Sequence, residues 1–157
     1  MKILNPHPGY VIDRLAILDL KIAAATEASI NPIPFQAEKV SLENYLRGWE
    51  SCLVEEWAWD VQKLEERQGK INRDKNGLTA VNALLWEAQD KVRELSEMEL
   101  TKLAFLAKRI AKLSDARSEM IRELNDVYGA GKNVEKIFGV SIGRTETPST
   151  QMKLKFV

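Results

Sequence analysis

The residues of this 157-residue chain that could carry chemistry are charged side chains at positions where a helix would be apolar. Arg14 follows Val11 by three residues and precedes Leu18 by four, which places it on the apolar face of a helix. Lys21 continues the same face, and Arg117 interrupts a second apolar series. A charge buried alone costs several kcal/mol, so these cations require carboxylates, an anionic ligand or another chain.

Three interpretations of these cations remain open. Asp13, Asp90 and Asp115 are carboxylates that could neutralise them in an internal network and fix the register of the helices. Alternatively, the arginines line a polar pocket between helices and hold an anion through two parallel hydrogen bonds each. In the third interpretation the long side chains simply extend to solvent.

Three blocks of the chain resemble a family of uncharacterised small bacterial proteins. Residues 8–22 begin Pro-Gly-Tyr-Val-Ile-Asp-Arg-Leu and are similar to that family's opening helix. Residues 81–93, which include Asn-Ala-Leu-Leu-Trp, and the Asp-Ala-Arg of residues 115–117 resemble its two later blocks, in the same order. The likeness covers about residues 8–130. Tyr10 and Gln89 stand where the family usually has acidic residues, and Ser114 where it has Asn.

The resemblance implies an all-α fold and a single constellation of polar residues, and it brings no established activity. Members of the family tend to accompany genes for surface-glycan assembly. The ligand-binding residues that we expect from the resemblance and from the spacing together are Asp13, Arg14, Lys21, Asn82, Trp86, Asp90, Arg109, Asp115 and Arg117.

We therefore expect a non-catalytic, oligomeric binding protein that holds a small anionic, nucleotide-like ligand between the first, third and fourth helices. Arg14, Arg109 and Arg117 would clamp the anion, and Trp86 would form a stacking wall. The neighbouring Asn and Asp side chains would orient ligand hydroxyls or the arginines. Such a protein could sequester its ligand, and it would need neither a cofactor nor a metal.

An enzymatic alternative rests on acidic residues in two parts of the chain. All-α nucleoside triphosphate pyrophosphohydrolases hold Mg²⁺ with Glu-x-x-Glu and Glu-x-x-Asp pairs on facing helices. The two acidic groups of this chain would face each other if residues 72–77 formed a turn between antiparallel helices. The candidate catalytic residues are Glu55, Glu56, Asp60, Glu87 and Asp90, although Glu56 and Asp60 are four residues apart rather than three. Solvent-exposed acidic helix faces would give the same pattern, and a third alternative is a structural helical adaptor in a protein complex.

The elements that must position these side chains are helices. Apolar periodicity predicts an antiparallel bundle of about four, with short extended N- and C-terminal segments. The sequence Ser96-Glu97-Met98-Glu99 is a capping box that marks the start of the last helix. Cys52, mid-helix beside Leu53, is expected to be buried. The expected ranges are about 10–25, 37–68, 78–95 and 97–128, with a polar connection at 72–77.

The predicted helical domain spans residues 1–138, and residues 139–157 read as a loop followed by a strand-like tail. The tail alternates Met152, Leu154 and Phe156 with lysines, which is the period of a strand, and residues 1–4 could pair with it. An isolated pair of this kind would be marginal without support from the bundle or from another chain.

The composition excludes several classes of function. The chain has 23 basic and 23 acidic residues, so its net charge of zero argues against nucleic-acid binding. One His and one Cys exclude His-rich and Cys₂His₂ metal sites as well as disulfides, which favours a reducing, cytoplasmic location. The sequence contains no apolar run of about 18 residues, so it predicts no membrane span. Four Trp residues favour a homo-oligomer, with the second helix as its interface.

Overall fold

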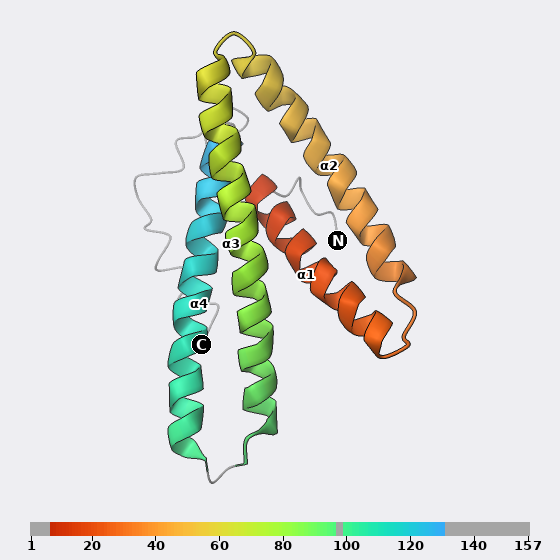
Figure 1. Ribbon diagram of the computed structural model, residues 1–157, viewed down its shortest axis with the longest axis vertical. Coiled ribbons are helices and arrows are strands. Elements are labelled where there is room, and N and C mark those ends of the chain that lie inside the picture. The colour runs from red at the N-terminus through yellow and green to blue at the C-terminus, as the bar shows by residue number, and fades with distance from the viewer. Residues whose placement is uncertain (1–6, 97–98, 131–157) are drawn as a thin grey trace, which may run out of the picture.

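The computed structural model describes residues 7–96 and 99–130, and within these ranges the chain forms four α-helices and no strand (Figure 1). The predicted all-α class is confirmed. The expected extended terminal segments and the strand-like tail lie outside the described residues. The helices are α1 (Pro8–Glu27), α2 (Ile33–Trp57), α3 (Val61–Glu94) and α4 (Leu100–Val127).

The first helix begins close to where the sequence predicts. Pro8 occupies the first turn of α1, where its missing N–H has no helical partner to lose. The helix ends at Glu27, where the Ala28 N–H donates to the Ala24 carbonyl oxygen at 3.0 Å and the Ser29 N–H donates to that of Thr26 at 3.2 Å. Ser29 then adopts a positive φ of 56°, which turns the chain toward α2.

The break between the second and third helices lies at residues 58–60, and the predicted connection at 72–77 is wrong. Asp60 caps α3, because its carboxylate accepts a hydrogen bond from the Lys63 backbone N–H at 3.1 Å. Gly69 and residues 72–77 lie inside α3. The fully buried Ile71 and Leu78 flank this polar stretch, and their burial outweighs the low helix propensity of its Gly and Asn residues.

Helices α3 and α4 form a long antiparallel pair (Figure 1). Their apolar residues alternate at three- and four-residue steps, as in a coiled coil, and both predicted apolar stripes keep this spacing. At the turn between them, the Ser96 backbone N–H donates to the Glu99 carboxylate at 3.2 Å, as in the predicted capping box. The helix nevertheless begins at Leu100 with Glu99 as its N-cap residue, so the predicted start at Ser96 is wrong. The residues of this series are, in α3 and at its C-cap, Leu78, Val81, Leu85, Ala88, Val92 and Leu95, and, in α4, Leu103, Leu106, Ile110, Leu113, Met120, Leu124 and Val127.

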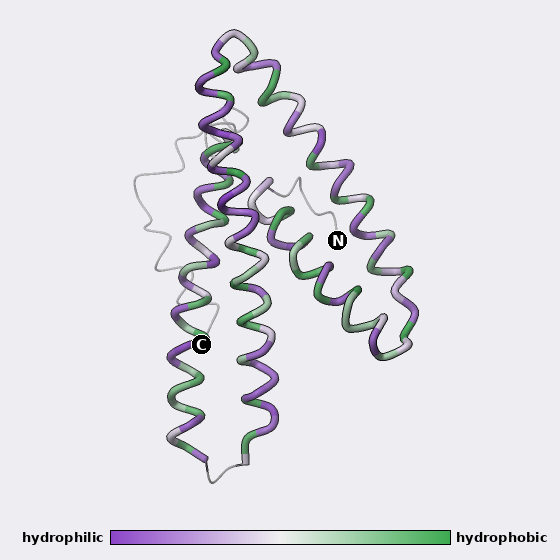
Figure 2. The backbone as a smooth tube through the Cα atoms, in the orientation of Figure 1, coloured by the Kyte–Doolittle hydropathy of each residue, from purple (hydrophilic) through white to green (hydrophobic). Residues whose placement is uncertain are grey.

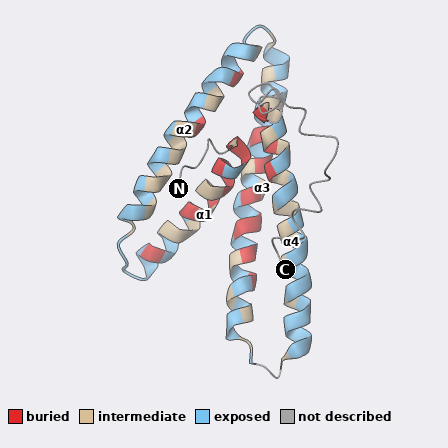
Figure 3. Ribbon diagram, turned by 180° about the vertical axis from the view of Figure 1, so that it is seen from behind, coloured by how far each residue is buried: buried red, intermediate tan, exposed pale blue. Residues whose placement is uncertain are grey.

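The core sits where all four helices meet, at the start of α1, the first half of α3 and the end of α4. Helix α2 packs mainly on α1 and stays largely exposed along its outer side (Figure 3). The half of the α3–α4 hairpin next to the turn that joins the two helices is more exposed than the half that packs on α1 (Figure 3). The buried core residues are Val11, Ile12, Leu46, Leu53, Ile71, Leu78, Ile121, Leu124 and Tyr128.

Hydrophilic and hydrophobic residues are interspersed along every helix (Figure 2). Among the described helices, none combines the length and the apolar composition that a membrane crossing would need. Cys52 is exposed, contrary to the prediction, because the neighbouring Leu53 is the residue that turns into the core.

Candidate functional site

The central polar feature is a buried carboxylate that joins three helices. Asp13 of α1 is 5% exposed and accepts hydrogen bonds from both other members of the group. The Arg117 Nε of α4 donates to Asp13 Oδ1 at 2.8 Å, and Arg117 Nη2 donates to Oδ2 at 2.5 Å. The Asn82 Nδ2 of α3 donates to Oδ1 at 2.9 Å. Three of the nine expected site residues therefore form one network, which we call the Asp13 lock.

The Asp13 lock depends on a close approach of α1 to α4. A Cβ at Gly9 would lie 2.3 Å from the backbone oxygen of Ile121, a distance that no side chain tolerates. The Gly9 backbone N–H also donates to Asn125 Oδ1 at 2.7 Å. Sequence reasoning missed both Gly9 and Asn125 as positioning residues. The sequence offered little signal, because Gly9 lies just before the predicted start of the first helix, where glycine is an ordinary turn residue.

Arg14 and Lys21 make contacts with α2 instead of joining the lock. The Arg14 guanidinium donates to both carboxylate oxygens of Glu38, at 2.7 and 3.0 Å. This hydrogen-bonded pairing raises the pKa of Arg14 and lowers the pKa of Glu38 from their ordinary values. Lys21 lies over the ring of Phe35, with its Nζ 5.6 Å from the ring centroid. Glu38 was not among the residues expected from the sequence.

The remaining expected residues are not brought together with the lock by any contact in the described structure. Asp90 pairs with Arg93 one turn further along α3. Arg109 is exposed on α4. Asp115 lines a shallow surface depression of about 490 Å³ that also contacts Tyr10. Trp86 is half-buried on α3. The predicted constellation therefore divides into an internal network and several surface residues.

The acidic residues of the enzymatic alternative lie far apart. Asp60 caps the start of α3 and Glu87 lies near its end, so about 40 Å of continuous helix separates them at 1.5 Å per residue. Glu55 and Glu56 are exposed in the last turn of α2, at the Asp60 end. Within the described ranges, no three His, Cys, Asp or Glu side chains are arranged to hold a metal ion.

An open cleft of about 460 Å³ lies between α1, α2 and α3. Lys39 pairs with Asp19 at 2.7 Å, and Lys75 pairs with Glu50 at 3.4 Å. Arg47 is the cation at the rim that forms no ion pair with any described residue. The floor is apolar (Ile12, Leu15, Ala16 and Leu46) and the rim is polar (Asp19, Lys39, Glu43, Arg47, Glu50, Lys75 and Thr79). Neither Arg14 nor the Asp13 lock contributes to this lining.

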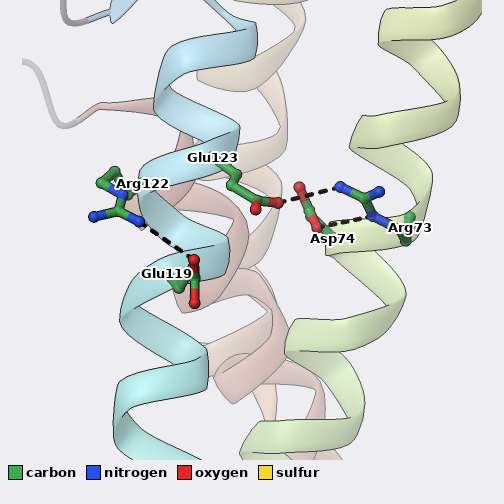
Figure 4. A network of polar contacts seen from close by, with 5 residues as sticks. All are labelled: Arg73, Asp74, Glu119, Arg122 and Glu123. Carbon is green, nitrogen blue, oxygen red and sulfur yellow. Dashed lines mark hydrogen bonds and ion pairs between the residues drawn. The ribbon is translucent and has the colours of Figure 1, made fainter.

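A second buried carboxylate lies between α3 and α4 (Figure 4). Asp74 is 4% exposed, and its Oδ2 has no hydrogen-bond partner. Arg73 donates to Asp74 Oδ1 at 3.4 Å and to Glu123 at 3.2 Å, so one cation serves two carboxylates (Figure 4). Burial raises the pKa of Asp74, and the Glu123 carboxylate raises it further.

The turn between α2 and α3 carries an aromatic cluster. The rings of Trp57 and Trp59 stack with their centroids 6.0 Å apart. The Arg67 guanidinium lies 3.9 Å from the Trp57 centroid, and the Lys63 ammonium lies 5.0 Å from it. Trp59 is 74% exposed, whereas Trp57 packs against the core. Both cations lie against the Trp57 ring, and the Lys63 ammonium also lies 6.0 Å from the Trp59 centroid, so these contacts join the end of α2 to the start of α3.

The described structure establishes a small all-α protein. Comparisons with protein-family models, with curated proteins and with solved structures find no match to this chain.

Proposed function

We propose that this chain is a non-catalytic helical module that acts by assembling with other polypeptide chains. One observation carries the proposal: each arginine that breaks an apolar face is neutralised by a carboxylate of its own chain. Arg117 donates two hydrogen bonds to Asp13, and Arg14 donates two to Glu38. A guanidinium with both parallel donors engaged has little capacity left to clamp a ligand anion.

The burial of the Asp13 lock supports a structural role. Asn82 and Arg117 together neutralise and orient one carboxylate, so α1, α3 and α4 meet in a defined register. In several proteins, buried polar groups of this kind select one packing arrangement among several apolar ones. A rigid bundle with a fixed register would present its exposed helix faces reproducibly, as an assembly module requires.

The same geometry argues against the pyrophosphohydrolase alternative. Four carboxylates must converge to clamp Mg²⁺ on a triphosphate. Asp60 and Glu87 lie toward opposite ends of one continuous helix, so their carboxylates cannot converge within one chain.

A thermal-shift screen tests the proposal. A ligand that binds only the folded chain raises the melting temperature in proportion to the logarithm of its concentration over Kd. We expect no saturable rise with inorganic phosphate, nucleoside mono-, di- and triphosphates or nucleotide sugars, relative to chloride at equal ionic strength. A saturable rise with any of them contradicts a purely assembling role.

A second candidate function is supported by Arg47. This guanidinium lines the cleft between α1, α2 and α3, and it has no ion-pair partner in the described part of the chain. A small anionic, nucleotide-like ligand in this cleft would supply the missing negative charge. Calorimetric binding of phosphate or a nucleotide that is lost in Arg47→Gln and kept in the exposed control Arg122→Gln would replace the first proposal with this one.

A further inference from the structure

The buried carboxylate of Asp74 has one oxygen that no donor reaches. Its Oδ1 accepts from the Arg73 guanidinium at 3.4 Å, which is long for a hydrogen bond between charged groups. Its Oδ2 is fully enclosed and has no hydrogen-bond partner in the described part of the chain. A buried acceptor without a donor loses the hydration that it has in the unfolded chain, so this oxygen requires an explanation.

The Arg73 guanidinium shows what lies beside that oxygen. Nε and one terminal nitrogen of an arginine form a fork that fits the two oxygens of a single carboxylate, as Arg117 holds Asp13 in this protein. Arg73 divides the same fork between two residues. Its Nε donates to Asp74 Oδ1, and its Nη2 donates to Glu123 Oε2 at 3.2 Å. Two carboxylates therefore lie side by side where one would fit (Figure 4).

The two carboxylates differ in their access to water. Asp74 is 4% exposed and cannot turn outward, whereas the Glu123 side chain is 43% exposed. The charged groups that act on Asp74 are Arg73 from its own helix and Glu123 from α4, and the described parts of α1 and α2 contribute none. The next residue along α3, Lys75, pairs with Glu50 of α2 instead. The group is therefore an isolated set of two acids and one base.

This set is one positive charge short when both acids are ionised. Two carboxylates in contact do not both ionise readily, so one member of such a pair holds its proton to a higher pH. Burial and the Glu123 carboxylate both raise the pKa of Asp74. The enclosed member of the pair is therefore the one that binds the proton.

We propose that Asp74 takes up a proton on Oδ2 and donates it in a hydrogen bond to the Glu123 carboxylate, which fastens α3 to α4 in acid. The proton comes from solvent, which reaches the pair at the exposed Glu123 side chain. With the proton bound, Oδ2 has a partner, and Arg73 balances the one remaining negative charge. This pair, which we call the acid clasp, is a pH-sensitive contact, and it does not depend on the proposed assembling function.

Loss of the proton reverses each of these contacts. As the pH rises, the two anions repel each other, and Glu123 is the member that can rotate toward water. The acid clasp therefore stabilises the bundle in acid, and this stabilisation is lost as the pH rises through the pKa of the folded chain. Asp74 lies between the buried Ile71 and Leu78, and Glu123 precedes the buried Leu124, so the change acts directly on the packing of α3 against α4.

An NMR titration of the Asp74 carboxyl carbon in the full chain tests which group raises its midpoint. Glu123→Gln removes the neighbouring negative charge and should move the Asp74 midpoint to lower pH. The control Glu119→Gln removes an exposed carboxylate of α4 that pairs with Arg122, and it should leave the midpoint unchanged. A midpoint that is the same in Glu123→Gln and in the wild type overturns the proposal, because burial alone would then hold the proton.

Urea denaturation at neutral pH tests the hydrogen bond itself. In the wild-type background, Glu123→Gln relieves the repulsion of two anions and should raise the urea midpoint. In an Asp74→Asn background, the amide Nδ2 donates permanently to Glu123, as the protonated acid would. There the same substitution removes a hydrogen bond to a charged acceptor and should lower the folding equilibrium constant by about tenfold.

The change of sign between the two backgrounds is the signature of the acid clasp. All of these substitutions are nearly isosteric, so each variant is expected to keep the helix content of the wild type by circular dichroism. Glu119→Gln should have the same small effect in both backgrounds. An effect of Glu123→Gln that has the same sign and size in both backgrounds overturns the hydrogen bond between Asp74 and Glu123.

Discussion

Asp13 and Arg117 are 104 positions apart in the sequence and form a two-point ion pair that fastens the first helix to the last. The carboxylate is almost fully buried, and the guanidinium side chain is one-third exposed at 34%. Hydrogen bonding to Asp13 raises the pKa of Arg117 from its ordinary value, so the guanidinium stays protonated at neutral pH. The interior of the bundle therefore holds an ionic contact that is complete without a ligand.

Removing Arg117 should cost far more stability than removing Arg14. Arg117→Ala leaves Asp13 buried with only Asn82 as a partner, and we expect a loss of about 2–4 kcal/mol in the free energy of unfolding. Arg14→Ala breaks a pair whose two side chains are 40% and 39% exposed, and we expect a loss of about 0–1 kcal/mol. Urea denaturation of both variants measures the difference. Equal losses in the free energy of unfolding would show that the Asp13 lock contributes no more than the exposed Arg14–Glu38 pair.

Gly9 should not tolerate a side chain. Gly9→Ala forces a methyl group against the Ile121 backbone oxygen, which cannot move without shifting α4. We expect a destabilisation of about 1–3 kcal/mol or more. The control Gly69→Ala adds a methyl group where no atom lies within 4 Å and should stabilise α3 by roughly 0.5–1 kcal/mol. Thermal unfolding by circular dichroism compares them, and a neutral Gly9→Ala would contradict the close approach of α1 to α4.

The ionised Asp74 carboxylate should lower the free energy of unfolding at neutral pH, compared with a neutral side chain at this position. Its pKa is raised by burial and by Glu123, so the folded chain binds a proton more readily than the unfolded chain. The stabilisation from that proton is fully present below the ordinary Asp pKa of 3.8 and is lost as the pH rises through the higher folded pKa.

Asp74→Asn imitates the protonated form and tests this sign. The variant should unfold at a higher urea concentration than the wild type at neutral pH, and the gain should shrink as the pH falls toward about 4. Glu119→Gln is the control. It removes an exposed carboxylate of α4 and should give no such gain. A gain for Asp74→Asn that grows on acidification would reverse the assignment.

The pyrophosphohydrolase alternative predicts pyrophosphate release from nucleoside triphosphates, whereas the geometry predicts none. With Asp60 and Glu87 about 40 Å apart along α3, we expect no pyrophosphate release from nucleoside triphosphates in the presence of Mg²⁺. A colorimetric assay over a range of triphosphates checks this. Release that is lost in Asp90→Asn would show that carboxylates from separate chains converge in an assembly.

The sequence predicts the fold class and two of the four helices closely, because long apolar stripes dominate the choice of structure. The misplaced break between α2 and α3 has a physical cause. Gly69 and the polar residues 72–77 are helix-breaking by local propensity, but Ile71 and Leu78 bury fully and keep the helix intact. The true turn contains neither Gly nor Pro and depends on the side-chain cap of Asp60.

The candidate site was only partly accessible to sequence reasoning. Spacing correctly identifies Arg14 and Arg117 as cations that require partners, because both interrupt an apolar face. It cannot choose between Asp13, Glu38 and a ligand as the partner, since that choice depends on how close α1 comes to α2 and to α4. The close approach is set by Gly9 and the backbone of Ile121, which carry no charge pattern at all.

The central claim is that Asp13, and not a ligand, neutralises Arg117. A double-mutant cycle with Asp13→Ala and Arg117→Ala, measured by urea denaturation with and without inorganic phosphate, tests it most directly. We predict a favourable coupling energy of about 1–3 kcal/mol that phosphate leaves unchanged. A coupling energy near zero, together with stabilisation of the wild type by phosphate that Arg117→Ala abolishes, would contradict the account.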